Sequence, residues 1–379
     1  MSAPTQTAAA SPLVTVAEEK VAAATQLQLT WWRFRKHRLA VASGILVILF
    51  YIGAIFADFL AVTEPHATEA ARSYIPPQAI HFFDEDGSFK PHVYALKGRR
   101  DMRTFKLIYA PDPADKRYLR LFADGYSYNL LGIFETNRHL IGLDRGKAED
   151  ALFLLGTDQL GRDVWSRLML ATRTSLFIGL IGVGLSLFLG VLLGGISGLY
   201  GGVVDTVIQR VIEILRSIPT IPLWMGLAAA LPNTWSVTQV YIAITVIISL
   251  IGWTELARVV RGRFLALREE DFITAAELAG ASRLRIIFRH MVPSFLSHII
   301  AAVSLALPAM IISETTLSFL GLGLRPPAIS WGVLLQDAQN IQALGIAPWL
   351  LVVAVPVIIV ILAFNFLGDG LRDAADPYG

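Results

Sequence analysis

The stretch TSLFIGLIGVGLSLFLGVLLGGISGLY, residues 174–200, contains no charged side chain and is long enough to cross a lipid bilayer as a helix. The hydrocarbon core of a bilayer is about 30 Å thick, and a helix of roughly 20 apolar residues spans it. In the whole chain of 379 residues 54% are hydrophobic and 16% are charged, whereas about a quarter are charged in soluble domains. The sequence therefore predicts an integral membrane protein.

Further apolar runs have the length of a membrane span. The six predicted spans are 39–62, 174–200, 206–231, 239–259, 295–320 and 348–368. The first is longer than the roughly 7–15 apolar residues of a signal peptide, so we interpret it as a retained anchor. Residues 1–38 predict a disordered tail that ends in the basic, aromatic segment WWRFRKHR.

Arginine and lysine in short flanking segments orient the predicted spans, because these residues resist translocation. They precede the first span and crowd the segment of about 260–294, whereas the connections 232–238 and 321–347 hold a single arginine between them. We therefore expect both tails, including 369–379, and the segment 260–294 to lie in the cytoplasm. The fold class that follows is an all-α polytopic membrane protein with six transmembrane helices.

The long segment 63–173, which leads into the second span, must then lie outside the cytoplasm. Asp-Gly turns between short aromatic and aliphatic runs in HFFDEDGSFKPHVYAL (81–96) and RYLRLFADGYSYNLLGIF (117–134) are typical of hairpins. We expect a small β-rich extracytoplasmic insertion. The acidic cluster Asp84–Asp86 lacks the ligand spacing of an EF-hand and ends in Gly87, which favours a turn over a calcium loop.

Small residues recur every fourth position in the second predicted span and form one smooth helix face for close packing. They are Gly182, Ser186, Gly190, Gly194 and Gly198. We prefer packing to a role in lining a pore; the sequence does not say which helix fills the groove.

Ionisable residues inside membrane spans are costly and are therefore candidates for function. Glu213 lies three residues from both Arg210 and Arg216, which favours a local ion pair, and Asp58 is close enough to the end of its span to reach the interface. Glu314 has only Ser and Thr as polar neighbours, and two alternatives stay open: it faces a wet pathway or a partner subunit, or its role is structural.

Several classes of function are excluded or unsupported. The formal net charge of +2 gives no case for nucleic acid. The chain has no cysteine, no phosphate-binding GxxxxGK[ST], no HExxH, no GxSxG and no histidines at metal-ligand spacing, so we expect no enzyme activity, cofactor or metal. Uphill transport would need an ion gradient or another subunit.

The segment DFITAAELAGASRLRIIFRHMVPS, residues 271–294, predicts two short amphipathic helices. Its apolar stripes at helical spacing are Phe272, Ala275, Ala276 and Ala279, then Leu284, Ile287, Phe288 and Met291. At about 100° per residue the second stripe is turned about 120° from the first, so one straight helix would not align them. We expect Gly280 to end the first helix, Ser282 to cap the second and Pro293 to mark the start of the next span.

The first of these helices is thin on its alanine side, which suits insertion into a groove of another protein. The alternative is a helix lying on lipid headgroups, although surface helices usually carry larger anchors than alanine.

AAELAGASRLRIIFRHMVP resembles the cytoplasmic EAA loop of ABC-importer permeases. Ala275, Ala276, Gly280 and Pro293 match that pattern in type and spacing, whereas Thr274 stands where the family often has Glu. The blocks LLGTDQLGRDVWSRLMLATRTSL (154–176), ISETTLSFLGLGLRPPAISWG (312–332) and LGDGLRDAADP (367–377) are similar to the C-type permease subunit of oligopeptide, dipeptide and nickel importers.

The resemblance implies the type I ABC importer permease fold in a bacterial inner membrane, with residues 174–368 as the transmembrane domain. It also implies a heterodimer with a second, homologous permease subunit, two cytoplasmic ATPases and an extracytoplasmic substrate-binding protein. The loop containing Thr274, Ala275, Ala276, Ala279, Gly280, Ser282 and Pro293 would dock into an ATPase. Peptides are the default cargo, with nickel, glutathione or oligosaccharides as alternatives. A secondary transporter and a membrane-anchored scaffold remain rival hypotheses, and the role of 63–150 stays open, docking of the binding protein being one possibility.

Overall fold

The computed structural model describes residues 26–100, 102, 107–144, 151–232 and 234–375. Most of the predicted disordered tail, residues 1–25, lies outside this described part of the chain, as do residues 376–379. The rest of the tail differs from the prediction, because Gln26–Phe34 forms helix α2 and not coil.

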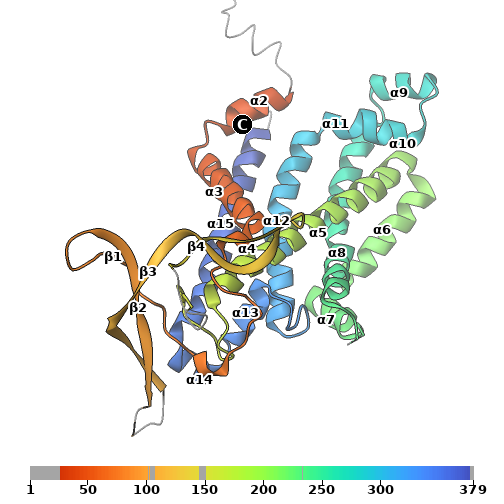
Figure 1. Cartoon of the computed structure of the whole chain (residues 1–379). Helices are drawn as coiled ribbons and strands as arrows, with labels where there is room; N and C mark the ends of the chain where they lie inside the picture. Colours follow the sequence, from red (N-terminus) through yellow and green to blue (C-terminus); the bar gives the residue numbers. More distant parts are fainter. Residues whose placement is uncertain (1–25, 101, 103–106, 145–150, 233, 376–379) are drawn as a thin grey trace, which may run out of the picture.

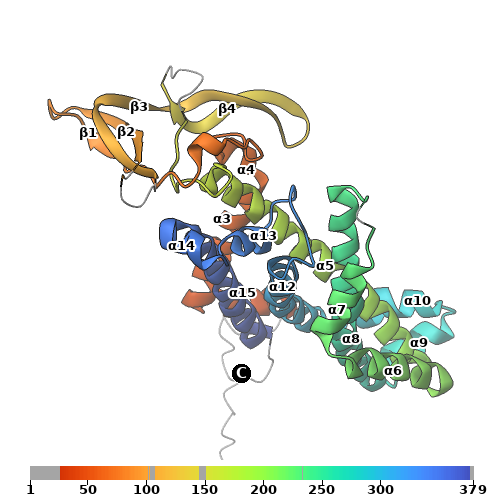
Figure 2. The ribbon, with the colours of Figure 1, turned by 90° about the horizontal axis from the view of Figure 1, so that it is seen from below.

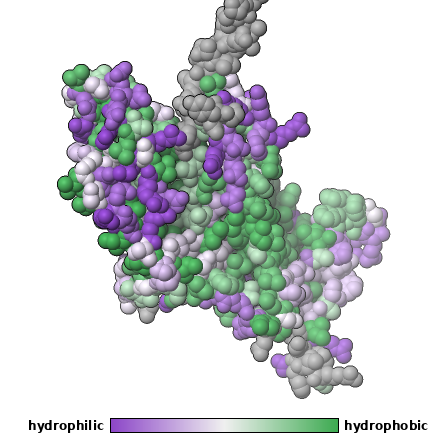
Figure 3. Space-filling view, turned by 180° about the vertical axis from the view of Figure 1, so that it is seen from behind, coloured by the Kyte–Doolittle hydropathy of each residue, from purple (hydrophilic) through white to green (hydrophobic). Residues whose placement is uncertain are grey.

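Among the described residues, five helices or helical segments are long and apolar enough to cross a membrane. They are α3 (Arg38–Ile55), α5 (Val164–Tyr200), α8 (Val237–Leu267), α12 (Leu296–Phe319) and α15 (Ala354–Ala375), the last preceded by the 3-10 turn η3 (Pro348–Val353). Figure 1 shows α2, α9 (Asp271–Leu278) and the C-terminal end of α15 at the same end of the molecule. Apolar side chains cover the middle of the face in Figure 3, and hydrophilic ones gather towards that end.

The third predicted span, 206–231, is not one helix. It consists of α6 (Gly202–Ser217) and α7 (Thr220–Ala229), which are bent by 87° relative to each other. Pro219 at the break has no N–H to donate and holds the preceding Ile218 in an extended conformation, so the helix ends there. The pair counts as a sixth span only if the two helices cross together.

Two other boundaries differ from the apolar runs. Helix α3 ends at Ile55 and is followed by the short helix α4 (Ala57–Leu60), whereas the predicted run continued to 62. Helix α5 begins at Val164, ten residues before the predicted span, because Asp163 caps it by accepting a hydrogen bond from the Ser166 N–H. Helix α3 thus ends before its apolar run does, whereas α5 extends beyond the apolar part of its span.

The predicted β-rich insertion is present. Its antiparallel sheet has the order β1 (His81–Phe83), β2 (Phe89–Arg100), β3 (Leu107–Leu130) and β4 (Phe134–Leu143), after the 3-10 turn η1 (Ala70–Arg72). The acidic cluster forms the β1–β2 turn, as predicted: Gly87 has a φ of +76° and its N–H donates to the Asp84 carbonyl oxygen. Figure 2 shows the sheet beside α4 and the start of α5, at the edge of the helical bundle.

The stripe of small residues packs α5 against α8, with α12 contributing at one end. A Cβ atom on Gly190 would lie 2.9 Å from the Leu256 Cβ, and one on Gly198 would lie 2.6 Å from the Phe264 Cβ. A Cβ atom on Gly182 would lie 3.1 Å from the side chain of Met310 in α12. The main core then continues from α5 through α12 and α15 to the short helices α13 (Trp331–Asp337) and α14 (Ile341–Ile346).

Candidate coupling segment and transport cavity

The segment between α8 and α12 folds as two short helical arms joined at a glycine. Helix α9 ends at Leu278, and Gly280 follows with a φ of +77°, a conformation that favours glycine. The Ser282 hydroxyl then accepts from the Arg285 N–H and caps α10 (Arg283–Arg285). These features confirm the predicted helix, glycine and capped second helix.

The second arm continues as a π-helical turn, η2 (Ile286–Met291), and the three-residue helix α11 (Val292–Ser294). Pro293 lies in α11, directly before α12, and so marks the entry to that span as expected. A π turn bonds i to i+5, which shifts side chains relative to an α-helical pattern. For this reason the predicted second stripe is wrong in part: Leu284 and Phe288 are exposed, whereas Ile286 is buried with the other two.

The burial of the first stripe also differs from the prediction. Ile273 and Ala276 face the protein and are buried, whereas Phe272, Ala275 and Ala279 are exposed. The inward-facing side chains join one apolar cluster with Phe264 of α8, Ile287 of η2 and Phe295 at the start of α12. Through this cluster α9 and η2 are packed together with side chains of α8 and of the start of α12.

A hollow of about 380 Å³ opens beside α9. Its lining residues come from both arms, and they are Ala276, Ala279, Ala281, Arg285, Arg289 and His290. Large apolar side chains are exposed on the same two arms: Phe272 at 43%, Leu278 at 85%, Leu284 at 55% and Phe288 at 44%. Exposed apolar groups around a hollow of small and basic residues are typical of a surface that another protein covers.

The two arms are also tied to the long helices by charge. Arg283 of α10 forms an ion pair with Glu277 of α9, and its guanidinium lies 5.9 Å from the ring centroid of Tyr200 at the end of α5. Below them Arg261 of α8 makes two hydrogen bonds of 2.5 Å to Asp205 of α6. The Arg283 contacts thus join the two arms to each other and to the end of α5, and the Arg261–Asp205 pair joins α8 to α6.

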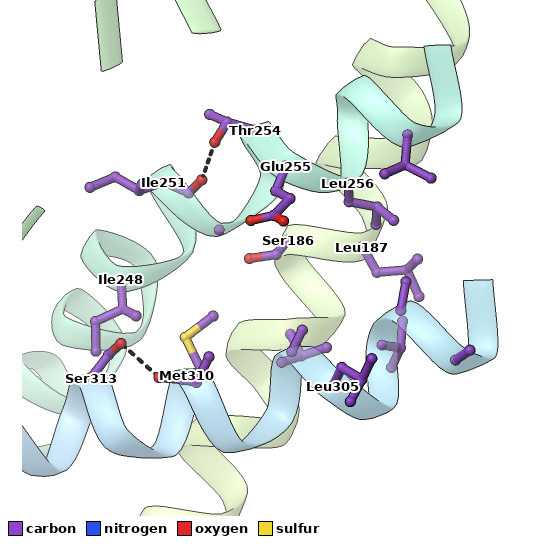
Figure 4. A pocket seen from close by; sticks show the side chains of 18 of the residues that line it. Ser186, Leu187, Ile248, Ile251, Thr254, Glu255, Leu256, Leu305, Met310 and Ser313 are labelled. Atoms are coloured by element: carbon purple, nitrogen blue, oxygen red, sulfur yellow. Dashed lines mark hydrogen bonds between the residues drawn. The ribbon is translucent and has the colours of Figure 1, made fainter. Parts of the chain in front are cut away.

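A second, larger cavity of about 1480 Å³ lies between α5, α7, α8, α12 and the end of α15. Aliphatic side chains form most of its wall, and Figure 4 shows Ile248, Leu256, Leu305 and Met310 around it. Three arginines and three carboxylates lie among the remaining lining residues: Arg216, Arg263, Arg372, Glu255, Asp369 and Asp373. Such a wall can accept a solute that carries both charges and apolar groups.

Comparison with known proteins decides the family. Residues 190–378 match the family "Binding-protein-dependent transport system inner membrane component", and residues 25–77 match "N-terminal TM domain of oligopeptide transport permease C". The oligopeptide transport system permease protein OppC of Bacillus subtilis (strain 168) is 37% identical over 243 residues, which cover 64% of this chain and 76% of that relative. This chain belongs to the binding-protein-dependent ABC importer permeases.

Two further similarities complete the comparison. OppC of Escherichia coli (strain K12) is 41% identical over 223 residues, covering 59% of this chain and 71% of that relative. The solved inward-facing MetNI methionine ABC transporter, in its CY5 native crystal form, has 19% identity and a TM-score of 0.42 over 55% of this chain and 95% of that chain. The family and these relatives show that the chain is a multi-pass membrane permease subunit of an importer.

Glu314 of the permease does not face the large cavity. Its side chain is fully buried, and it accepts hydrogen bonds from the hydroxyls of Ser175 (2.9 Å) and Ser318 (2.8 Å). The Trp331 N–H donates to the same Ser175 oxygen at 3.1 Å. The expectation that Glu314 lines a pathway or subunit interface is therefore not met in this conformation, in which it joins α5, α12 and α13.

The ion pair predicted for Glu213 and Arg210 is present, with a distance of 2.6 Å between Arg210 Nη1 and Glu213 Oε2. A buried ion network at the start of α5 was not predicted from the sequence. There Arg167, only 2% exposed, lies 3.2 Å from Asp337 of α13 and also pairs with Asp158. Arg162 joins both carboxylates, at 2.7 Å and 3.1 Å. The presence of Arg167 next to an apolar run was a usable signal, because a charge in that position needs a partner.

Proposed function

We propose that this permease forms half of the translocation pathway for peptides and is driven by a cytoplasmic ATPase that binds α9. The complete importer contains a second, homologous permease subunit, two ATPase subunits and an extracytoplasmic substrate-binding protein. Both termini and α9 lie on the cytoplasmic side in this proposal, and the sheet lies on the opposite side. ATP hydrolysis belongs to the separate subunits.

The observation that carries the proposal is that α9 is buried on one side and exposed on the other. On the inner side Ile273 and Ala276 join an apolar cluster with side chains of η2 and α8, whereas Ala275, Ala279 and Leu278 are exposed at the end of the molecule. Small exposed side chains let a partner surface approach the helix closely, and a fixed inner side transmits a rigid-body motion. Thr274, which replaces the usual Glu, is also exposed, so docking relies on shape and small residues.

Peptide cargo is supported by the names of the relatives, which are oligopeptide transport permeases, and by the composition of the large cavity. A peptide carries a positive and a negative terminus together with side chains of varied polarity. Arginines and carboxylates in a mostly aliphatic wall can accommodate that mixture without selecting one side chain. Selectivity then rests largely with the binding protein.

The test is ATP-dependent uptake of a labelled oligopeptide into vesicles that contain the complete importer. Ala279→Trp adds bulk to the exposed face of α9, and we expect it to abolish uptake and to release the ATPase subunits on purification. Val203→Trp adds similar bulk at a residue that is 79% exposed near the end of α5, and uptake should persist. Uptake by the Ala279→Trp importer at the unaltered rate would contradict the proposed docking. Transport of nickel, glutathione or an oligosaccharide, and not of peptide, would contradict the cargo alone.

A further inference from the structure

The β3–β4 hairpin has an unusually apolar tip. The sequence there is Asn129-Leu-Leu-Gly-Ile-Phe134, and the exposed fractions are 53% for Leu131, 73% for Ile133 and 64% for Phe134. The β1–β2 turn of the same sheet is built instead from acidic residues and a glycine. Three adjacent exposed apolar groups at a tip form a patch that is normally covered in the working protein.

The backbone conformation of this turn usually requires short polar residues, so apolar residues there are unusual. The Ile133 N–H donates to the Leu130 carbonyl oxygen at 3.1 Å, and the two central residues, Leu131 and Gly132, have φ values of +55° and +71°. Turns with two left-handed residues favour Asn-Gly or Asp-Gly, because short polar side chains tolerate that conformation. A leucine there adds strain and places an aliphatic side chain outward, and an apolar environment would offset that cost.

The base of the hairpin is fixed to the outer end of the first membrane helix. His139 of β4 has its Nδ1 atom 3.0 Å from the carbonyl oxygen of Asp58 in α4, and Phe122 of β3 lies 6.1 Å from the ring of Phe59. The Asp58 carboxylate forms an ion pair of 2.5 Å with Arg173 of α5. The hairpin is thus anchored where α3 and α5 leave the apolar layer.

Both ribbon views show the direction of the hairpin from this anchor. In Figure 1 the β3–β4 ribbon runs across the long direction of the helices at the level of α4, and in Figure 2 it lies along the edge of the bundle. Helix α3, which ends directly before α4, is a candidate membrane span and exposes aliphatic side chains, with Ile48 at 59%, Leu49 at 57% and Ile52 at 47%. The anchor of the hairpin at α4 therefore lies next to the end of a candidate membrane span.

We propose that the β3–β4 hairpin lies on the outer surface of the membrane and inserts Leu131, Ile133 and Phe134 among the lipid headgroups. The insertion reaches only the interfacial layer, where water and headgroups can still bond the backbone of the exposed strand edge. An aromatic ring and aliphatic groups at that depth are favoured in the same way as other interfacial anchors. The hairpin then holds the sheet close to the bilayer, whatever cargo the importer carries.

The chain contains no cysteine, so single cysteines can be introduced without removing others. Ile133→Cys and Ile108→Cys form a matched pair at opposite ends of β3, with exposed fractions of 73% and 55% for the native side chains. Each is labelled with a nitroxide in the complete importer, reconstituted in phosphatidylethanolamine and phosphatidylglycerol vesicles. The measurement compares collision of the label with oxygen, which concentrates in lipid, and with a water-soluble nickel chelate.

We expect the ratio of oxygen to nickel collisions to be several-fold higher at position 133 than at position 108. Equal ratios at the two positions would overturn the proposal. So would a label at 133 that becomes shielded from nickel only when the substrate-binding protein is added, because the patch would then belong to that protein. Phe134→Cys, which alters another exposed side chain, provides the same readout if the first variant does not fold.

Discussion

Replacement of Gly198 by alanine tests the packing of α5 on α8. The added Cβ would lie 2.6 Å from the Phe264 Cβ and 3.0 Å from the carbonyl oxygen of Arg261, so the α8 backbone would have to shift. Gly184, on the same helix, provides the control, because a Cβ there has no neighbour within 4 Å. Both substitutions gain the same helix propensity of about 1 kcal/mol, and overpacking costs about 1–3 kcal/mol at Gly198 alone.

The difference in free energy of unfolding between the two variants should therefore be about 1–3 kcal/mol. Because membrane proteins often unfold irreversibly, we would compare the unfolding temperatures of the purified variants in one detergent at one scan rate. Gly198→Ala should unfold at a lower temperature than the wild type, and Gly184→Ala at the same or a higher temperature. A Gly198→Ala variant as stable as Gly184→Ala would refute the close approach of the two helices.

Three further predictions concern charged groups. Arg167→Met should destabilise the permease by about 1.5–3 kcal/mol, because Asp158 and Asp337 lose one of the two arginines that bond them, whereas Arg210→Met, in an exposed pair, should cost less than about 1 kcal/mol in the same unfolding assay. Glu314→Gln should retain transport and stability, whereas Glu314→Leu should lower the free energy of unfolding by about 1–3 kcal/mol. Loss of transport by a stable Gln variant would contradict a purely structural role. The Lys116 ammonium donates to Asp84 and holds the pKa of that carboxyl well below its usual range, so its contribution to stability is present above about pH 4 and is lost as the pH falls below that value. The protection of the β1–β2 amides, measured relative to the intrinsic exchange rate at each pH, should fall there, and Lys116→Met should weaken this dependence on pH, because the Glu85 N–H and the Tyr118 hydroxyl still donate to Asp84.

Properties set by local patterns were predictable from the sequence. The apolar runs gave the long helices, because length and hydropathy are sufficient to indicate a span. Gly280 and Ser282 indicated the break between α9 and α10, since left-handed backbone and helix capping each favour particular residues. The turn at Gly87 followed from the same chemistry.

Properties set by distant contacts were not predictable. The stripe at Phe272 was assigned by periodicity alone, and the burial of Ile273 depends on helices that pack against α9 from elsewhere in the chain. One of the two hydrogen-bond partners of Glu314, Ser175, lies on α5, more than a hundred residues away in the sequence. The break in the third span at Pro219 could have been recognised, because a proline within an apolar run favours a kink or an end.

The most direct test of the account is a crosslink between α9 and the ATPase. Ala279→Cys, in a chain without other cysteines, would carry a short thiol-reactive photo-crosslinker in the complete importer, with Val203→Cys as the matched control. The account predicts a covalent adduct with an ATPase subunit from position 279 and none from position 203. An importer that transports peptide but yields no adduct from position 279 would contradict the claim that α9 couples the permease to ATP hydrolysis.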